Sequence, residues 1–315
     1  MSSPESGLAA ALKSVVEGRA FPMAQWPADW GSPETLGLRI SGEQVQVPPD
    51  WVALRQDRIL SHLDVDGRAW IKRLVLLPVA GSTNDLAMAE ARERDIEGLV
   101  LHAEMQTAGR GRRGRAWTSP LGGSLSLTLG FDWPGPVSTL SGLSPVVGLA
   151  VLDALLLAGA KDIGLKWPND LLTGQGKLAG VLIELLPAEG TTRVVVGVGI
   201  NLRVSGAQRA QVDQPIDDLE SVCGGVLPDR SVLIATLVSH LARFVLAFRS
   251  AGFESFAGTY DAHHLAHSRE VTVREGDRER TVHVLGIARD GGLKVQSADG
   301  VEVLHGGEVS LRLRS

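Results

Sequence analysis

The spacing of hydrophobic and polar residues divides the chain into three regions with different periods. From residue 70 onward, short apolar runs alternate with stretches in which apolar residues recur at helical spacing. We expect strands over 71–77, 99–103, 124–129, 163–167, 178–185 and 193–198, and helices over 83–94, 143–158 and 233–248. This alternation predicts an α/β or α+β domain of about 200 residues.

The C-terminal region returns to a period of two, with Gly- or Asp-containing turns between the runs. Five short strands within 269–315 predict a small β-barrel. The alternating apolar positions are Val271 and Val273, Val282 and Val284, Leu293 and Val295, Val301 and Val303, and Val309, Leu311 and Leu313.

The first 65 residues follow neither pattern. We expect a short helix over 8–16, a β-hairpin over 38–47 and a helix over 51–63, while Pro22, Pro27 and Pro33 exclude another long helix before residue 36. Residues 1–64 contain five Lys or Arg and eight Asp or Glu, a net charge of −3. Because neutralising phosphates supplies most of the affinity for nucleic acid, this balance argues against a DNA-binding surface.

Composition places the 315-residue chain among soluble globular proteins, with a prior of about two domains. Its net charge is −5 and 44% of its residues are hydrophobic, which excludes a disordered chain. A single cysteine, Cys223, excludes an internal disulfide framework and a multi-thiol zinc site. The longest apolar run, 146–160, contains Asp153 and is too short to span a bilayer, and no secretion signal is visible. We therefore expect a cytoplasmic protein.

One segment stands out chemically, because it contains four arginines and three glycines in seven residues: Gly109-Arg110-Gly111-Arg112-Arg113-Gly114-Arg115. Glycines allow the backbone to approach an anion, and guanidinium groups bind carboxylates and phosphates. Taken alone, the segment fits a solvated basic loop, a nucleic-acid or localisation patch, or a small-molecule anion site. It matches neither a Walker A motif nor a dinucleotide-binding fingerprint.

Four further motifs lie at the ends of predicted elements, and each has an ordinary structural explanation. In chain order, these explanations are the N-cap of a helix, an ordinary turn, a charged residue in a hairpin, and a cap after a buried strand. The four motifs are Gly81-Ser82-Thr83-Asn84, Lys166-Trp167-Pro168-Asn169-Asp170, Gly176-Lys177-Leu178-Ala179-Gly180 and Gly197-Val198-Gly199-Ile200-Asn201.

Together and in this order, these motifs and the segment 106–117 resemble those of biotin protein ligases. The resemblance covers about residues 68–315, including the C-terminal run 306–312. It implies an α+β fold: a central mixed β-sheet catalytic domain similar to class II aminoacyl-tRNA synthetases, and an SH3-like C-terminal β-barrel. We place the catalytic domain at 66–268 and the barrel at 269–315. Residues 1–65 then correspond to a degenerate winged-helix remnant whose hairpin resembles the wing and which lacks a recognition helix.

The family joins biotin to ATP, forming biotinyl-5′-adenylate and pyrophosphate, and then transfers biotin to one lysine of a carrier protein. The resemblance therefore implies an ATP-dependent ligase that uses biotin, ATP and Mg²⁺ and acts on a biotin carboxyl carrier protein of acetyl-CoA carboxylase or a similar domain. In the first step the carboxylate of biotin approaches the α-phosphate of ATP, and these two anions repel each other. The site must neutralise and align them, and no covalent nucleophile of the enzyme is needed for this. This agrees with the lack of a convincing Ser/His/Asp or Cys/His set.

The resemblance also implies roles for individual residues. Lys177 contacts the carboxylate and α-phosphate during the reaction, with Arg112, Lys166 and Asp170 as further catalytic candidates; no dedicated metal site is expected. The glycine–arginine loop is expected to be mobile when empty and to order on an anion. The biotin-binding candidates are Ser82, Thr83, Asn84, Gln106, Gly109, Arg110, Gly111, Arg112, Lys177 and Gly180. The nucleotide-binding candidates are Arg110, Arg112, Arg115, Trp117, Asn169, Asn201 and Arg312.

Three alternatives stay open from the sequence: a lipoate-type ligase of the same fold, a DNA-binding biotin sensor and a catalytically dead scaffold. We expect no sequence-specific DNA binding and no membrane association. Some relatives form homodimers edge to edge through the central sheet, and the sequence leaves the oligomeric state open.

Overall fold

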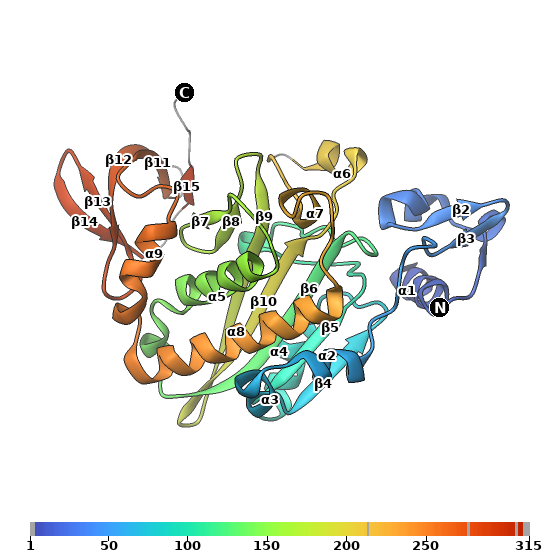
Figure 1. Cartoon of the computed structure of the whole chain (residues 1–315), viewed down its shortest axis with the longest axis horizontal. Helices are drawn as coiled ribbons and strands as arrows, with labels where there is room; N and C mark the ends of the chain where they lie inside the picture. The colour runs from blue at the N-terminus through green and yellow to red at the C-terminus, as the bar shows by residue number, and fades with distance from the viewer. Residues whose placement is uncertain (1–3, 213, 276–277, 306–307, 311–315) are drawn as a thin grey trace.

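The computed structural model describes residues 4–212, 214–275, 278–305 and 308–310. A central α+β domain lies between a small N-terminal module and a C-terminal β-sheet, which sit at opposite ends of the molecule (Figure 1). The predicted fold class is confirmed. The exact boundaries at residues 65 and 268 remain predictions.

The central domain is built on a seven-stranded mixed sheet. Its strand order is β4-β5-β6-β10-β9-β8-β7, with β4 and β5 parallel and every other neighbouring pair antiparallel. The strands, in sheet order, are Arg73–Leu77, Leu99–Ala103, Ser124–Pro134, Thr191–Asn201, Lys177–Ala188, Asp170–Leu172 and Gly164–Lys166.

Helices cover both faces of this sheet. On one face, α5 (Leu143–Leu157) and α8 (Arg230–Ala251) pack against each other over the hydrophobic core, and on the other face α4 (Thr83–Glu93) lies over β6, β9 and β10. The remaining helices of the domain are α2 (Gln56–His62), α3 (Val65–Trp70), α6 (Gly206–Gln211), α7 (Leu219–Val222) and α9 (Ala257–His263).

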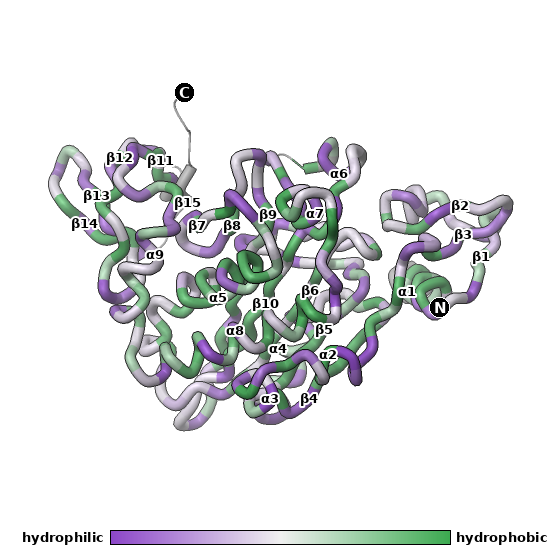
Figure 2. The backbone as a smooth tube through the Cα atoms, in the orientation of Figure 1, coloured by the Kyte–Doolittle hydropathy of each residue, from purple (hydrophilic) through white to green (hydrophobic). Residues whose placement is uncertain are grey.

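Two helices, Val137–Leu157 and Arg230–Ala251, are long and apolar enough to cross a membrane. Two-thirds of each is buried inside the protein, however, as in the core helices of a soluble domain. Figure 2 shows the hydrophobic residues of α5 and the central strands concentrated in the middle of the molecule. Their length and composition are therefore explained by packing.

Most sequence-predicted elements are present, but two predictions need correction and several short elements were not predicted. The helix expected over 51–63 begins only at Gln56, because the backbone of Val52 and Leu54 bonds instead to Arg230 and Glu104. The strand expected over 71–77 begins at Arg73, since the backbone N–H groups of 72 and 73 both bond to the carbonyl of residue 98. The short strand β8 was missed, because the sequence around it reads as a turn.

The N-terminal module has its own small core. It contains α1 (Pro4–Val16) and a sheet of order β1-β3-β2, with strands Phe21–Pro22, Gln44–Gln46 and Arg39–Ser41. Three short 3-10 helices, Met23–Gln25, Ala28–Trp30 and Pro33–Leu36, occupy the stretch between α1 and the hairpin, where a winged-helix domain would have its recognition helix. Met105 and Leu121 of the central domain complete this core. By contrast, Ile59 of α2 is buried in the core of the central domain.

The C-terminal region forms a five-stranded antiparallel sheet of order β14-β13-β12-β11-β15. The strands β11 to β15 span Glu270–Glu275, Arg278–Ile287, Leu293–Ser297, Gly300–Leu304 and Glu308–Ser310. Trp167 Nε1 donates to the carbonyl of Gly291 at 3.0 Å, and Ser141 Oγ donates to that of Asp290 at 2.8 Å. These bonds fasten the sheet to the central domain.

Candidate active site

A row of small polar side chains on the central sheet forms the floor of the site. Ser124, Ser126 and Thr128 of β6 are buried and alternate with leucines that face the hydrophobic core. Because successive side chains of a strand point to opposite faces, the hydroxyl groups face α4. Ser126 and Thr128 are functional candidates that the sequence analysis missed. The polar–apolar alternation over 124–129 was the signal that could have revealed them.

Ser82, Thr83 and Asn84 lie at the start of α4, directly over this row. Ser82 is the N-cap, with its Oγ accepting a hydrogen bond from the backbone N–H of Asp85 at 3.3 Å. The Oγ1 of Thr128 lies 2.8 Å from both Thr83 Oγ1 and Asn84 Oδ1. The N-cap explanation and the binding-site prediction are thus compatible.

Gln106 links the start of α4 to the sheet. Its Oε1 accepts hydrogen bonds from the backbone N–H and the hydroxyl of Thr83, at 2.7 and 3.1 Å. Its Nε2 donates to Ser126 Oγ at 3.0 Å, and Ser126 Oγ also lies 2.8 Å from Ser119 Oγ. The four polar residues predicted to line the biotin pocket are therefore close together and rich in directional hydrogen-bonding groups.

Glu184 of β9 is a second residue that the sequence analysis missed. Asn84 Nδ2 donates to its carboxylate at 2.9 Å, and Arg110 Nη2 lies 3.0 and 3.2 Å from its two oxygens. Arg110 also pairs with Asp85. Partial burial lowers the pKa of Arg110, but the two carboxylates outweigh this effect and raise it. Glu184 thus connects the polar pocket to the arginine-rich loop.

The glycine–arginine loop closes back on itself. Gly111 donates its backbone N–H to the carbonyl of Arg115 at 2.7 Å, and the carbonyl of Gly109 accepts from the N–H of Trp117 at 2.8 Å. Arg112 turns toward the sheet and donates to Asn169 Oδ1 at 2.9 Å, whereas Arg115 is exposed. The loop's mobility without ligand stays a prediction.

Lys177 begins β9 and forms an ion pair with Asp170 of β8. Its Nζ lies 2.8 Å from Asp170 Oδ1, and both side chains are 17% exposed. Lys166 is the cross-strand partner of Asp170 in the β7–β8 ladder. Gly180 lies under the ion pair, close to the end of the lysine side chain. Three of the predicted catalytic residues are therefore neighbours.

Trp117 lies beside this ion pair. Lys177 Nζ is 5.7 Å from the centroid of its ring, and the indole N–H donates to Ser124 Oγ at 3.3 Å. The ring packs against the backbone of Gly199, where a side chain would collide with it. This arrangement places a flat aromatic surface next to the cationic centre.

Asn169 and Asn201 both use their amide nitrogens within the protein. Asn169 Nδ2 donates to the carbonyl of Val181 at 2.8 Å. Asn201 Nδ2 donates to the carbonyls of Lys177 and Asp217, at 3.0 and 3.1 Å. Their contact with a nucleotide stays a prediction. The remaining nucleotide candidate, Arg312, lies outside the described residues.

A cavity of about 310 Å³ opens beside Arg112, between the central domain and the C-terminal sheet. Trp167 and Pro168 line one side, and Asp290 and His305 line the other. Among the described residues, no group of three or more His, Cys, Asp or Glu side chains is arranged to hold a metal ion. The site thus combines a cluster of hydrogen-bonded polar side chains around Gln106 with the cations of Arg110, Arg112 and Lys177.

Two family models match the chain. The biotin/lipoate A/B protein ligase family matches residues 76–201, and the biotin protein ligase C-terminal domain matches residues 268–312. The first match contains every predicted site residue except Arg312, and the second covers the C-terminal sheet.

Curated relatives and solved structures agree with these matches. The bifunctional ligase/repressor BirA of Escherichia coli is 32% identical over 90% of this chain and 85% of its own length. The biotin–[acetyl-CoA-carboxylase] ligase of Mycobacterium tuberculosis is 37% identical over 71% of this chain and 81% of its own length. A structure of biotin protein ligase from Aquifex aeolicus in complex with biotin and ATP is 28% identical, with a TM-score of 0.65, and covers 77% of this chain and 99% of that chain. The chain therefore belongs to the biotin protein ligase family, as its motifs predicted.

Proposed function

We propose that this protein activates biotin with ATP and transfers it to a lysine of a carrier protein. In the first step a carboxylate oxygen of biotin attacks the α-phosphorus of ATP, and the bond to pyrophosphate breaks. In the second, the lysine amine attacks the acyl carbon, an amide forms and AMP leaves. The observation that carries the proposal is the cluster of buried, hydrogen-bonded polar side chains formed by Ser82, Thr83, Asn84 and Gln106, together with the cations of Lys177 and the arginine loop.

In this proposal the polar pocket holds the neutral ring system of biotin. Thr83, Asn84 and Gln106 supply directional hydrogen bonds, and Ser126 and Thr128 complete the set from below. Neutral donors and acceptors suit a ureido group, which is itself uncharged and has both donors and acceptors. The carboxylate of biotin then extends toward Gly109, Arg110, Gly111, Arg112, Lys177 and Gly180.

The cations neutralise the two reacting anions. Lys177 provides a compact positive charge at the carboxylate and α-phosphate, while Arg110 and Arg112 provide bidentate donors. Asp170 holds Lys177 at 2.8 Å before substrate arrives, and Lys166 adds charge on the same edge. Trp117 offers its ring to adenine, with Asn169, Asn201, Arg115 and Arg312 as further nucleotide contacts.

Mg²⁺ is expected to accompany ATP, because it neutralises the charge of the phosphates. The described residues, which lack a cluster of metal-ligating side chains, fit an ion held mainly by the phosphates and water. The carrier is proposed to be the biotin carboxyl carrier subunit of acetyl-CoA carboxylase, and the reaction to take place in the cytoplasm. The name of the Mycobacterium tuberculosis relative supports this choice of carrier.

The test is biotin-dependent exchange of pyrophosphate into ATP, which reports the first step alone. We expect Lys177→Ala and Arg112→Ala each to lower kcat/KM at least about 10-fold, equivalent to about 1.4 kcal/mol of lost transition-state stabilisation. Lys72→Ala, at an exposed position before β4, is a control. Exchange with lipoate in place of biotin would preserve the mechanism and change the substrate. No exchange with either acid would refute the proposal.

A second function, as a repressor, is raised by one comparison. The match to the bifunctional ligase/repressor covers 90% of this chain, so it extends into residues 1–65. The three 3-10 helices between residues 23 and 36 and the negative charge of the module favour a ligase without sequence-specific DNA binding. Salt-dependent binding of the protein to duplex operator DNA, measured with biotinyl-5′-AMP present, would overturn this prediction.

A further inference from the structure

The backbone of Lys177 is held by a segment more than thirty residues further along the chain. Its N–H donates to the carbonyl of Pro215 at 2.9 Å, and its carbonyl accepts from the N–H of Asp217 at 3.0 Å. The residue between them, Ile216, forms an isolated parallel bridge with Lys177. The segment 215–217 therefore acts as a short extra strand beside the first residue of β9.

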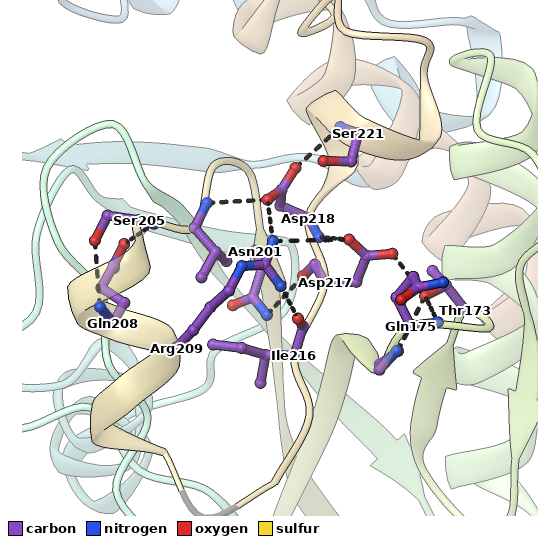
Figure 3. A network of polar contacts seen from close by, with 12 residues as sticks. Thr173, Gln175, Asn201, Ser205, Gln208, Arg209, Ile216, Asp217, Asp218 and Ser221 are labelled. Carbon is purple, nitrogen blue, oxygen red and sulfur yellow. Dashed lines mark hydrogen bonds and ion pairs between the residues drawn. The ribbon is translucent and has the colours of Figure 1, made fainter.

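The side chain of Asp217 fastens this segment to the turn before Lys177. Its Oδ2 accepts a hydrogen bond from Thr173 Oγ1 at 2.6 Å, and the same hydroxyl oxygen accepts from the backbone N–H groups of Gln175 and Gly176, at 3.0 and 3.2 Å. The side chain of Asp217 is only 7% exposed. Figure 3 shows Asp217 between Thr173 on one side and Asp218 on the other.

Asn201 closes the arrangement from β10. Its Nδ2 donates both to the carbonyl of Lys177 and to that of Asp217, so one amide group joins the two backbones. Asn201 is 9% exposed, and its two N–H groups are both used in this way.

The segment is also anchored from outside. Arg209 of α6 lies 3.1 Å from Asp218 Oδ2 and donates to the carbonyl of Ile216 (Figure 3). Asp218 accepts from the N–H of Val204 at 3.1 Å and from that of Ser221 at 2.9 Å, where it caps α7. The position of the segment 215–217 is therefore determined independently of Lys177, and it can serve as a fixed support.

We propose that Thr173, Asp217 and Asn201 are positioning residues for Lys177. They hold its backbone on both sides and so determine where its ammonium group lies relative to the reacting atoms. This inference rests on the proposed function, in which Lys177 neutralises the carboxylate and α-phosphate. Displacing a catalytic group by about 1 Å can cost as much as about 100-fold in rate.

A positioning role for these residues should affect the rate of the chemical step and not the binding of biotin. Thr173 and Asp217 have no hydrogen bond to the polar pocket formed by Ser82, Thr83 and Gln106. Loss of the support should therefore lower kcat and leave the KM for biotin unchanged. A residue that only stabilised the fold would lower the amount of active enzyme in proportion to its effect on stability.

The experiment compares Thr173→Val with Thr173→Ser in the pyrophosphate exchange assay on the full chain. Valine removes the hydroxyl group with little change in shape, whereas serine keeps it. We expect Thr173→Val to lower kcat about 10-fold with an unchanged KM for biotin, and Thr173→Ser to retain most of the wild-type kcat. Thr139→Val is a matched control, because Thr139 Oγ1 likewise donates one hydrogen bond, to the carbonyl of Pro136 at 2.7 Å, and accepts one from an N–H group, that of the Trp133 indole at 2.8 Å.

A double-mutant cycle tests whether the effect passes through Lys177. In the Lys177→Ala background, single-turnover formation of biotinyl-5′-AMP should be no slower with Thr173→Val than without it. An equal further loss in that background would overturn the proposal, as would a raised KM for biotin with unchanged kcat. Activity of Thr173→Val that falls only as its Tm falls, to the same extent as in Thr139→Val, would also overturn it. Absence of exchange in the wild type would instead refute the proposed function itself.

Discussion

The Nζ atom of Lys177 lies 2.8 Å from Oδ1 of Asp170, and the strand that carries Lys177 places Gly180 directly beneath the pair. A Cβ atom at residue 180 would lie 3.0 Å from both Cε and Nζ of the lysine and 3.5 Å from Asp170 Oδ1. The lysine side chain has room at this position only because residue 180 has no side chain.

Gly180→Ala should therefore displace the ammonium group without unfolding the protein. We expect kcat for pyrophosphate exchange to fall about 10-fold, because transition-state charge stabilisation depends on the position of the charge. Gly258→Ala in α9 is the matched control, since a Cβ there meets no atom within 4 Å. A rise in the KM for biotin without a change in kcat would show that residue 180 acts on biotin rather than on Lys177.

The packing of Trp117 on Gly199 leads to a prediction about ATP. A Cβ atom at residue 199 would lie 2.5 Å from Cε2 of the indole, so Gly199→Ala must move the ring. If the ring stacks on adenine, both Gly199→Ala and Trp117→Ala should raise the KM for ATP about 10-fold, since base–aromatic stacking is worth about 1–3 kcal/mol. The KM for biotin should change little. Exchange kinetics at varied ATP would decide, and an unchanged KM for ATP in both variants would contradict the stacking role.

The ion pair between Arg110 and Glu184 should restrain the glycine–arginine loop before substrate binds. Glu184→Gln keeps an acceptor for Asn84 but removes the negative charge that faces Arg110. Limited trypsin digestion without ligand should then cut after the loop arginines roughly 2- to 5-fold faster, as expected for loss of an ion pair worth up to about 1 kcal/mol.

The control for this digestion is Glu254→Gln, which removes an exposed carboxylate that pairs with Arg289 and with none of the loop arginines. Equal cleavage rates in the wild type and both variants would mean that Glu184 does not restrain the loop.

The lowered pKa of Glu104 should make the free energy of unfolding depend on pH. Burial by itself would raise its pKa, but interaction with His102 and Arg230 outweighs burial and lowers the pKa from 4.5 to about 2. A carboxyl group whose pKa is lower in the folded than in the unfolded protein stabilises the fold at pH values above its unfolded-state pKa. This stabilisation is lost as the pH falls from about 4.5 to about 2. The shift corresponds to about 3 kcal/mol.

Glu104→Gln should therefore be less stable than the wild type at pH 7 by about 3 kcal/mol, because it leaves Arg230, whose side chain is only 13% exposed, without its counter-charge. The difference should shrink as the pH is lowered toward 3. Urea unfolding at a series of pH values measures this, with the exposed Glu254→Gln as control. A difference that stays constant with pH would show that Glu104 stabilises the protein by packing alone.

The class of fold and the family could both be predicted from the sequence alone. Local periodicity predicted most strands and the long helices, because side chains in strands and amphipathic helices repeat on one face. Short motifs such as 109–115 and 166–170 identified the chemistry, because their spacing lies within a few residues of the chain. The prediction was wrong where the local pattern was ambiguous. Residues 51–55 are not helical, because their backbone bonds to Glu104 and Arg230, which are distant in sequence.

Which polar residues share the site depends on contacts between segments that are distant in sequence. Thr128 meets Asn84, Glu184 meets Arg110, and Asp217 meets Thr173 across separations of 44, 74 and 44 residues. In one sequence, an isolated Ser, Thr or Glu on a strand looks the same whether it faces solvent or a buried pocket. The strand order β6-β10-β9 and the position of α4 over it decide between the two, because sheet register sets which side chains from distant segments become neighbours.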